Sequence, residues 1–548
     1  MERRIFIAIG ISIAFLWIWA ALAPRFFPQL AKPKQAPART TTAPAKAAAP
    51  SEGQAPSPVE RERRAGRLSS TTRPMPVVDT EVRYSVVENH SYIARFSNRG
   101  AQLVSFQLKN YKDKNGKNVE LVKGRDPRNT DYPFFIESES ATVSALLNTA
   151  LYAVEERAER GVKIIEYRFA APDGPSATKT FRISQEYLID FAIRISPPIR
   201  YRVMTGPGIR TLSPAEEESK ILITGRGMVQ RDGDLDIIGR EDGDRLQIYD
   251  TADYIGIEDN YFLTVLRPAK GGPAVLRRTE IRDTKGLRKE WYAAVNAAPD
   301  GTLNGTAFLG PKETKLLDRY GLGEALQFGV FGIIARFLLE VLVWINQYTL
   351  NYGFAIIVLT ILIKIVLYPL QHKSIVSMKK MQRVQPKMEA IKNKYKKART
   401  DPEQRQKMNV EMMKLYQVEG INPMSGCIPI LLQLPILWGF YGLLSQAIEL
   451  RGAPWILWIR DLSEKDPTYI LPILMTATMF IQTYITPMTG DPMQRRMFLA
   501  MPIVFGFIFK DFPSGLVLYW LVQNILTIIQ QMIMNKWWKQ HPDELQKT

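Results

Sequence analysis

Long apolar runs in the second half of this 548-residue chain constrain its fold more than any other feature. These runs occupy residues 351–370, 424–448, 468–487 and 497–533. A helix of about 20 apolar residues crosses the hydrocarbon core of a bilayer, whereas an open sheet would leave backbone groups unpaired in lipid. The last run is long enough for two helices, with a break at residues 511–513, which read Asp-Phe-Pro. The sequence therefore predicts a membrane-embedded helical bundle.

A further apolar run lies at the N-terminus. Residues 5–23 carry no charge and follow two arginines, so we predict a transmembrane anchor over residues 1–23. A cleaved signal peptide is the alternative, because residues 21–23 read Ala-Leu-Ala. However, the run is longer than an ordinary signal core of about 7–15 residues, and Pro24 would follow the cut. The retained anchor brings the expected transmembrane helices to six, five of them in the C-terminal core region.

Two regions of different composition follow the anchor. Residues 24–76 are rich in Ala, Pro, Thr, Ser and Arg, which predicts a flexible linker. Residues 77–320 show apolar and polar residues in alternation, most clearly from Ile189 to Ser196, with Gly, Pro, Asn and Asp between the short runs. This pattern predicts an antiparallel all-β sandwich domain. Other strand-like runs are YIARF at 92–96, VKIIEYRF at 162–169 and WYAAV at 291–295.

Residues 321–348 have a helical apolar pattern with polar residues on one face, among them Arg336 and Glu340. The choice is between a transmembrane helix and a surface helix. If this helix crossed the membrane, every later loop would change sides, and the basic segment 371–420 would lie outside. The positive-inside rule argues against that arrangement. We therefore predict an amphipathic helix in the outer membrane interface.

The segment 371–420 separates the second and third expected transmembrane helices and carries thirteen Lys and Arg against five Asp and Glu. Methionines recur at helical spacing, and a capping box at residues 400–403 with Pro402 in the first turn starts a second helix. We predict a cytoplasmic helical hairpin whose first arm is kinked or interrupted at Pro386. Its methionines are either ordinary packing or an adaptable binding face, and its basic face is either solvated, lipid-facing or ribosome-binding.

The charge distribution also orients the chain. With six transmembrane helices, the positive-inside rule places both termini and the basic hairpin in the cytoplasm. The β domain then lies in the periplasm, joined to a transmembrane core over residues 349–534. Residues 535–548 form a short cytoplasmic tail that is only mildly basic.

Composition excludes the common catalytic and metal-binding arrangements. The chain has one cysteine and three histidines, without the clustering of a metal site, and it lacks a Gly-rich phosphate loop or a GxSxG motif. We therefore expect no cofactor and no metal. The net charge of +18 indicates an anionic partner such as lipid, RNA or the ribosome, without choosing among them.

One cation interrupts an expected transmembrane helix. Lys364 lies about seven residues, or roughly 10 Å, before the end of the run at 351–370. Its long side chain could reach the cytoplasmic headgroups, which is the alternative without function. The functional interpretation is that Lys364 faces a hydrated cavity in the bundle, which Thr360, one turn away, could share.

A polar stripe runs along the last expected helix at spacings of three and four residues. It includes Trp520, Gln523, Asn524, Thr527, Gln530 and Gln531. Such a stripe is costly against lipid, so it lines either a wet surface or a contact with another helix. Gln433 in the third run leaves the same two alternatives. None of these residues forms a nucleophile and base pair, which argues against catalysis.

Several long motifs resemble the YidC/Oxa family. NYGFAII precedes Lys364 and YPL follows it, QPKM lies in the basic hairpin, and NPMSGCIPILLQLP occupies residues 422–435. FPSGLVLYW at 512–520 is followed by Asn524 and TIIQQ. The resemblance is strong across 322–534 and weaker but collinear across 77–320. An N-terminal anchor with a large β domain is similar to the Gram-negative arrangement.

The resemblance implies a hydrophilic groove, open to the cytoplasm and to lipid, with a positive residue near its middle. It places that charge on Lys364, where the family usually has arginine; lysine keeps the charge but lacks the planar fork of the guanidinium group. It places the groove-lining threonine on Thr360. The substrate-contacting aromatic pair falls on Tyr519 and Trp520, a tryptophan where tyrosine is frequent.

The function implied by the resemblance is that of a membrane protein insertase and chaperone in the bacterial inner membrane, and not an enzyme. A polar tail of a client helix would enter the groove, where water and Lys364 reduce its desolvation cost, while the apolar segment moves into lipid. The implied partners are nascent membrane proteins and the Sec translocon. The basic hairpin adds the ribosome and anionic lipid.

Two other functions remain open at this stage. A solute transporter or channel could use Lys364 to bind an anion, although the sequence shows no internal repeat of the membrane runs. The β domain could also bind or convert a sugar, because the family's domain resembles carbohydrate-active sandwiches. Acidic residues such as Asp234 and Asp236 are present, but a fold analogy assigns no chemistry.

Overall fold

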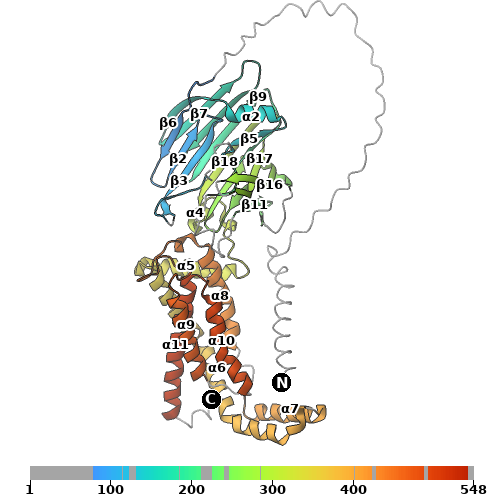
Figure 1. The fold of residues 1–548 in the computed structure, drawn as a ribbon, viewed down its shortest axis with the longest axis vertical. Helices are drawn as coiled ribbons and strands as arrows, with labels where there is room; N and C mark the ends of the chain where they lie inside the picture. The colour runs from blue at the N-terminus through green and yellow to red at the C-terminus, as the bar shows by residue number, and fades with distance from the viewer. Residues whose placement is uncertain are drawn as a thin grey trace, which may run out of the picture. The chain divides into compact units, whose positions relative to one another are not determined.

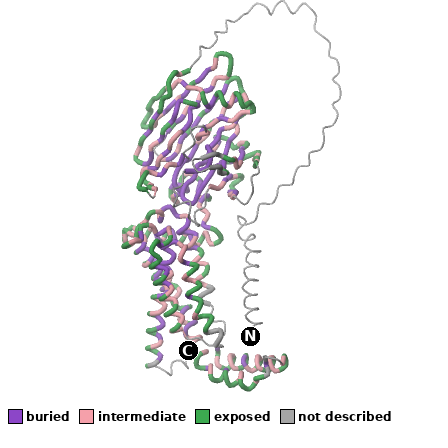
Figure 2. The backbone as a smooth tube through the Cα atoms, viewed as in Figure 1, coloured by how far each residue is buried: buried purple, intermediate pink, exposed green. Residues whose placement is uncertain are grey.

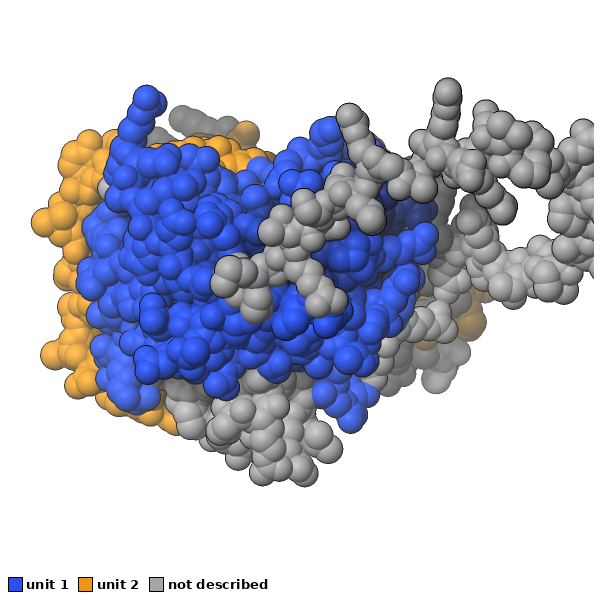
Figure 3. Space-filling model, turned by 90° about the horizontal axis from the view of Figure 1, so that it is seen from above, with its two compact units in different colours: residues 1–211, 225–258, 263–310 blue, residues 212–224, 259–262, 311–548 orange. Residues whose placement is uncertain are grey.

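The computed structural model divides the chain into two compact units, shown in separate colours in Figure 3. Strands make up most of the first unit and helices make up most of the second (Figure 1). The first unit comprises residues 1–211, 225–258 and 263–310, and the second comprises residues 212–224, 259–262 and 311–548. The structure describes residues 78–113, 115–122, 131–183, 186–210, 225–239, 246–283, 286–399, 401–421, 428–486 and 492–540.

Three antiparallel sheets form the first unit. The four-stranded sheet has the order β1 (Tyr84–Glu88), β2 (Tyr92–Ser97), β3 (Gln102–Lys112), β4 (Asn118–Glu120). The five-stranded sheet has the order β13 (Gln247–Ala252), β16 (Gly272–Asp283), β17 (Gly286–Asn296), β10 (Tyr201–Met204), β5 (Phe135–Ser138). The nine-stranded sheet has the order β12 (Asp234–Ile238), β11 (Arg226–Arg231), β14 (Tyr254–Glu258), β15 (Phe262–Pro268), β18 (Thr302–Pro311), β9 (Leu188–Ser196), β8 (Ser176–Ile183), β7 (Val162–Ala170), β6 (Ala153–Glu159). A short helix, α2 (Ala141–Thr149), also belongs to this unit.

Alternating burial along the strands creates the core of this unit. In β9, Ile189 and Phe191 are buried and the residues between them are exposed, as the period-two pattern predicts. Phe181 of β8 then contacts Phe96 of β2 and Phe134, with ring centroids 4.9 Å and 4.7 Å apart. These aromatic contacts join the nine-stranded sheet to the four-stranded sheet, and Figure 2 shows the buried residues running through the strands. The predicted β-sandwich is confirmed.

One inward position of β8 is occupied by a lysine that the sequence analysis missed. Lys179 is fully buried, and its Nζ donates to the carbonyl oxygens of Gly100 at 2.7 Å, Phe134 at 2.8 Å and Ala101 at 3.4 Å. Burial lowers the pKa of Lys179 to about 7 because it penalises the ammonium form. The three carbonyls satisfy the three donors of the ammonium group.

Eight α-helices shape the described part of the second unit. They are α4 (Thr314–Arg319), α5 (Gly332–Thr349), α6 (Tyr352–Lys394), α7 (Pro402–Val418), α8 (Ile428–Gln446), α9 (Ile470–Ile485), α10 (Pro492–Phe509) and α11 (Ser514–Gln540). A single buried cluster joins six of them, with Leu342, Leu359, Phe440, Met475, Phe509 and Tyr519 contributed by α5, α6, α8, α9, α10 and α11. This cluster holds the helices together as a bundle (Figure 1).

Only part of the predicted membrane topology can be compared with the described residues. Among them, α6 and α11 are the two helices long and apolar enough to cross a membrane. Helix α9 and the Arg496–Phe509 part of α10 are apolar but shorter. The predicted N-terminal transmembrane helix at 5–23 lies outside the described residues. The helical C-terminal region is confirmed, and the count of six transmembrane helices stays a prediction.

Helix α5 begins later than the predicted segment 321–348. The chain first forms a single 3-10 turn at Gly323–Ala325, and Gly329 adopts a left-handed backbone conformation with φ of 78°. Glycine favours such a conformation and disfavours a helix interior, so the helix starts at Gly332. Arg336 contacts Asp318 at 2.6 Å and Glu340 at 3.8 Å on the exposed side.

The exposed side of α5 is not only polar. Ile333, Phe337, Trp344 and Tyr348 are each more than half exposed, beside Arg336 and Glu340. The opposite side is buried in the bundle cluster. Apolar residues therefore occur on both sides of α5, which suits a helix that contacts protein on one side and lipid on the other.

The hairpin differs from the prediction at two points. Helix α6 continues through Pro386, because Val384 and Met388 on either side of it are buried against Met412 of α7. The expected interruption is therefore wrong. Helix α7 is capped by Asp401, whose Oδ1 accepts from the backbone N–H of Glu403 at 2.9 Å, whereas Thr400 lies outside the described residues.

Methionines from both arms of the hairpin pack together in its core. Met388 and Met412 are buried, and Met381 and Met408 lie against them in the same cluster. This arrangement favours the packing interpretation of the methionine spacing over an adaptable binding face.

Candidate functional site

Lys364 lies inside the bundle and bonds to another helix. Its side chain is 8% exposed, and its Nζ donates to Oγ1 of Thr527 on α11 at 2.8 Å. The Thr527 hydroxyl in turn donates to the carbonyl oxygen of Gln523 at 2.7 Å. Within the described parts of the chain, Lys364 has no acidic partner at ion-pair distance. A buried ammonium group with one neutral protein partner requires further hydrogen-bond acceptors, which water or a ligand can supply.

The depth of this contact matters for the interpretation of Lys364. Thr527 is the middle residue of α11, which runs from Ser514 to Gln540. At 1.5 Å per residue, the contact lies about 20 Å from either end of that helix. The amine of Lys364 is therefore held by a neighbouring helix inside the bundle.

Thr360 does not join the Lys364 contact. Its side chain is fully buried, and its hydroxyl donates to the carbonyl oxygen of Ile356 in the same helix at 2.6 Å. Threonine commonly makes this bond inside helices. The structure therefore places Thr360 one turn from Lys364 on α6, with its donor already used.

The polar stripe of α11 consists of two rows. Asn524 donates to the carbonyl oxygen of Met475 and to the Thr478 hydroxyl on α9, both at 3.3 Å. Gln531 donates to the Thr486 hydroxyl at 2.9 Å, also on the α9 side. These two residues bond α11 to α9, as interhelical contacts do in membranes.

The second row of the stripe lies toward α6. Thr527 contacts Lys364, and Gln523 and Gln530 lie four residues before and three residues after Thr527 on the same face. Neither Oε1 nor Nε2 of Gln530, nor Oε1 of Gln523, has a hydrogen-bond partner among the described residues, although all three atoms are buried. A buried amide atom without a partner costs about 1–3 kcal/mol.

Gln371 of α6 also has a buried amide atom without a hydrogen-bond partner among the described residues, and the sequence analysis did not predict it. Its side chain is 7% exposed, and its Oε1 has no hydrogen-bond partner. The available signal was its position two helical turns after Lys364, on the same face. Lys364, Thr527 and three glutamines therefore line the contact between α6 and α11.

The two aromatic residues of α11 have different surroundings. Tyr519 is fully buried, stacks on Phe440 with ring centroids 4.4 Å apart, and accepts a hydrogen bond from the side-chain amide of Gln433. Trp520 is partly buried and packs against Phe509 of α10, with ring centroids 5.0 Å apart. Gln433 and Tyr519 thus link α8 to α11, while Trp520 links α10 to α11.

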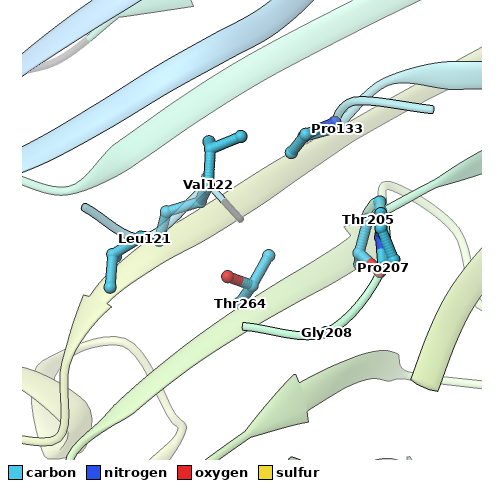
Figure 4. Close-up of a pocket in the computed structure, with 9 residues that line it drawn as sticks. Leu121, Val122, Pro133, Thr205, Pro207, Gly208 and Thr264 are labelled. Atoms are coloured by element: carbon cyan, nitrogen blue, oxygen red, sulfur yellow. The ribbon is translucent and has the colours of Figure 1, made fainter. Parts of the chain in front are cut away.

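A small pocket in the first unit bears on the sugar-binding alternative. Figure 4 shows it between Leu121, Val122, Pro133 and the loop at 205–208, with Thr264 at its base. Its volume of about 10 Å³ holds a single water molecule and not a sugar ring. Asp236 forms an ion pair with Arg231 at 2.7 Å and is not among the residues that line this pocket. No group of three potential metal ligands occurs within the described residues.

Comparisons with known proteins cover nearly the whole chain. The family model described as "YidC periplasmic domain" matches residues 85–341, and the model described as "60Kd inner membrane protein" matches residues 344–541. A membrane protein insertase YidC from Geobacter metallireducens is 34% identical over 564 residues, covering 98% of both chains. The corresponding protein of Geobacter sulfurreducens is 35% identical and covers 81% of this chain and 85% of its own.

A solved structure, titled "Active YidC insertase crystal structure with the first transmembrane domain resolved", shares 20% identity. It covers 84% of this chain and 93% of its own, with a TM-score of 0.37. The two family models together span most of the sequence, and the relatives align over nearly its full length. The chain therefore belongs to the YidC family of membrane protein insertases.

Proposed function

We propose that this chain is a membrane protein insertase and chaperone that receives client transmembrane segments in a hydrophilic groove and releases them into the bilayer. The observation that carries the proposal is the buried Lys364, bonded to Thr527 of α11, with unpaired buried amide atoms at helical spacing on the same faces of α6 and α11. Buried polar groups without protein partners indicate a hydrated surface. The relatives bear the name of insertase, and no reaction chemistry is required for this activity.

Hydrophobic transfer supplies the free energy in this proposal. A central apolar residue gains roughly 0.3–0.6 kcal/mol on insertion scales, so a segment of about 20 gains on the order of 6–12 kcal/mol. Each charged residue that must cross costs about 2.5–3.5 kcal/mol. Water near Lys364 lowers that cost for a short polar tail, and the apolar segment then moves along α8 and α11 into lipid. Thr360, Gln433, Tyr519, Trp520, Gln523, Asn524 and Thr527 complete the proposed groove region.

We further propose six transmembrane helices with both termini in the cytoplasm of a bacterial inner membrane. The proposed domains are the anchor 1–23, the linker 24–76, the periplasmic β domain 77–320, the interfacial helix 321–348, the core 349–534 with its hairpin 371–420, and the tail 535–548. The exposed apolar side of α5 beside Arg336 and Glu340 supports its interfacial position. The excess of Lys and Arg in the hairpin supports its cytoplasmic side.

Nascent membrane proteins are the proposed clients, with the Sec translocon as a partner for some of them. The basic hairpin would meet anionic lipid or the ribosome. These partners follow from the family and from the charge of the hairpin.

Reconstitution tests the proposed function directly. The intact protein in liposomes should insert a single-span client made in a cell-free system, which protease protection of the client tail would reveal. Empty liposomes and liposomes with an unrelated polytopic protein are the controls. Release of trapped anionic solute without a client, and no gain in client protection, would instead indicate a transporter or channel.

A further inference from the structure

The facing sides of α6 and α11 carry buried amide atoms that have no hydrogen-bond partner among the described residues. Gln530 of α11 is 8% exposed and Gln371 of α6 is 7% exposed. Both amide atoms of Gln530, Oε1 of Gln371 and Oε1 of Gln523 have no hydrogen-bond partner. Together these residues present four unpaired, buried amide atoms within the described bundle.

Two contacts fix where these glutamines lie. The Lys364–Thr527 hydrogen bond joins the helices at one point, and Ile375 of α6 packs with Met534 of α11 at another. Both helices run in the same direction between these points. Gln371 lies between the two contact residues of α6, and Gln530 lies between those of α11. Gln371 and Gln530 are therefore in one stretch of the α6–α11 contact, beyond the Lys364–Thr527 hydrogen bond, and Gln523 lies one turn before Thr527 on α11.

On the neighbouring face of α11, the side-chain amides are hydrogen-bonded to other residues of the bundle. Asn524 and Gln531 have the same chemistry; Asn524 bonds to Met475 of α9, and Gln531 bonds to Thr486, the residue that caps the end of α9. Glutamines that served only to join α6 to α11 would be bonded in the same way. The row that contains Gln523 and Gln530 is left unpaired, so its amides are available to another molecule.

The hydrogen-bonding groups of a side-chain amide indicate what kind of molecule binds to it. An amide has one carbonyl acceptor and an NH₂ donor, which together complement the C=O and N–H of a peptide group. A client tail that crosses the bundle in extended form carries one such peptide group per residue, and each must find a partner away from water. Gln523 and Gln530 are two turns apart, about 10.5 Å, which corresponds to about three residues of extended chain.

We propose that Gln371, Gln523 and Gln530 bind the main chain of an extended client segment as it passes Lys364. This inference rests on the proposed insertase function and names what its groove recognises. Lys364 attracts acidic side chains, whereas the glutamines recognise peptide groups that every client shares. Binding of this kind is independent of client sequence.

A client with one ester bond in its translocated tail tests the proposal. An ester replaces a peptide N–H by oxygen and leaves every side chain unchanged. The tail is kept neutral so that attraction by Lys364 does not contribute. In proteoliposomes with the intact protein, an ester at a contacted position should slow insertion about threefold to tenfold, as expected for one lost hydrogen bond. Without backbone binding, the ester should insert equally fast or faster, because it has one donor fewer to desolvate.

A double-mutant comparison assigns the effect to the glutamines. With Gln530→Met, insertion of the all-amide client should slow by a similar factor, and the ester should cause no further loss. Gln531→Met, on the α9 side, should keep the full ester effect. Thermal unfolding of Gln530→Met should occur at or above the wild-type temperature, because an unpaired amide is removed.

The outcomes separate this inference from the proposed function. If wild-type protein inserts amide and ester clients equally fast, or if Gln530→Met keeps the ester effect, these amides hold only water and the inference is wrong. If wild-type protein does not insert the all-amide client at all, the proposed function itself fails.

Discussion

Lys179 in the β unit and Lys364 in the bundle are both buried, but their hydrogen-bond partners differ. Lys179 in the β unit has three carbonyl acceptors within 3.4 Å, so its ammonium group is satisfied by protein alone. Lys364 in the bundle has one protein acceptor, the Thr527 hydroxyl. All three N–H donors of the Lys179 ammonium group are thus hydrogen-bonded, whereas only one donor of the Lys364 ammonium group is bonded to a described residue. Spare donors are what a site for water or an acidic client tail requires.

Lys179 should make the stability of the β unit depend on pH. Its pKa is about 7 in the folded protein and about 10.4 in an unfolded chain. Between these values the unfolded state binds more protons, so stability rises with pH, by at most about 1.4 kcal/mol per pH unit, and is lost as pH falls toward 7.

Lys179→Met provides the measurement. Hydrogen exchange of β8 amides in the intact proteins gives the unfolding free energies of wild type and Lys179→Met. The wild-type value should rise relative to that of Lys179→Met from pH 7 to pH 10. A difference that stays constant over this range would show that Lys179 does not titrate there.

The two rows of α11 should respond differently to substitution. Asn524→Leu removes two hydrogen bonds to α9 and should destabilise the bundle by about 1 kcal/mol. Gln523→Leu, at the adjacent position, removes an amide whose Oε1 is unpaired and should leave stability unchanged or slightly raised. Reversible unfolding in mixed micelles measures both. Equal losses for the two variants would contradict the division into rows.

At the scale of elements, some features follow directly from sequence and others depend on packing. Ile189 and Phe191 alternate with exposed residues in β9, so a local pattern was sufficient to predict that strand. The break before α11 was predictable for the same reason, because Asp-Phe-Pro interrupts an apolar run. Continuation of α6 through Pro386 was not, since burial of Val384 and Met388 against α7 is a tertiary effect.

The candidate site shows the same limit. Lys364 and the polar stripe of α11 could be identified from the sequence, because a polar or charged side chain inside an apolar membrane run is energetically costly. Which helix each polar residue faces could not be read from spacing: Gln523 and Asn524 are adjacent in sequence yet lie in different rows. Lys179 was missed because a lysine at an inward strand position is indistinguishable from an exposed one until its carbonyl acceptors are known.

The hairpin core gives a prediction at this scale. Met412 is 9% exposed and packs between the arms, whereas Met413 is 54% exposed. Met412→Ala should destabilise α7 by about 2–3 kcal/mol through the lost packing, and Met413→Ala by less than about 0.5 kcal/mol. Faster hydrogen exchange of α7 amides in Met412→Ala alone would be the expected result. Similar exchange in both variants would argue against a packed methionine core.

At the scale of the whole molecule, the proposal requires a defined orientation in the membrane. In a Cys427→Ser background, Arg157→Cys in β6 and Lys407→Cys in α7 place single thiols at charged positions of the β domain and the hairpin. A membrane-impermeant maleimide added to spheroplasts should label the first and reach the second only after lysis. Labelling of Lys407→Cys in intact spheroplasts would overturn the proposed topology.

The proposed function also connects the parts of the molecule. The sandwich supplies a folded domain in which the pocket beside the loop at 205–208 is too small for a sugar ring. The hairpin supplies a basic surface, and the bundle supplies the one buried lysine with spare donors among the described helices. The activity is therefore expected to depend on the bundle. Its most specific feature is the charge of Lys364, which should favour clients with acidic tails.

Insertion of one client with acidic, neutral and basic tails tests this claim most directly. Proteoliposomes would contain wild-type protein, Lys364→Arg or Lys364→Leu, with thermal unfolding as the control for folding and protease protection as the readout. Lys364→Leu should slow the acidic client at least about fivefold, the neutral client less and the basic client least, because a charge contact at about 4 Å contributes roughly 1–4 kcal/mol. Lys364→Arg should retain the wild-type order. Equal insertion of all three tails by wild-type protein and Lys364→Leu would contradict the account.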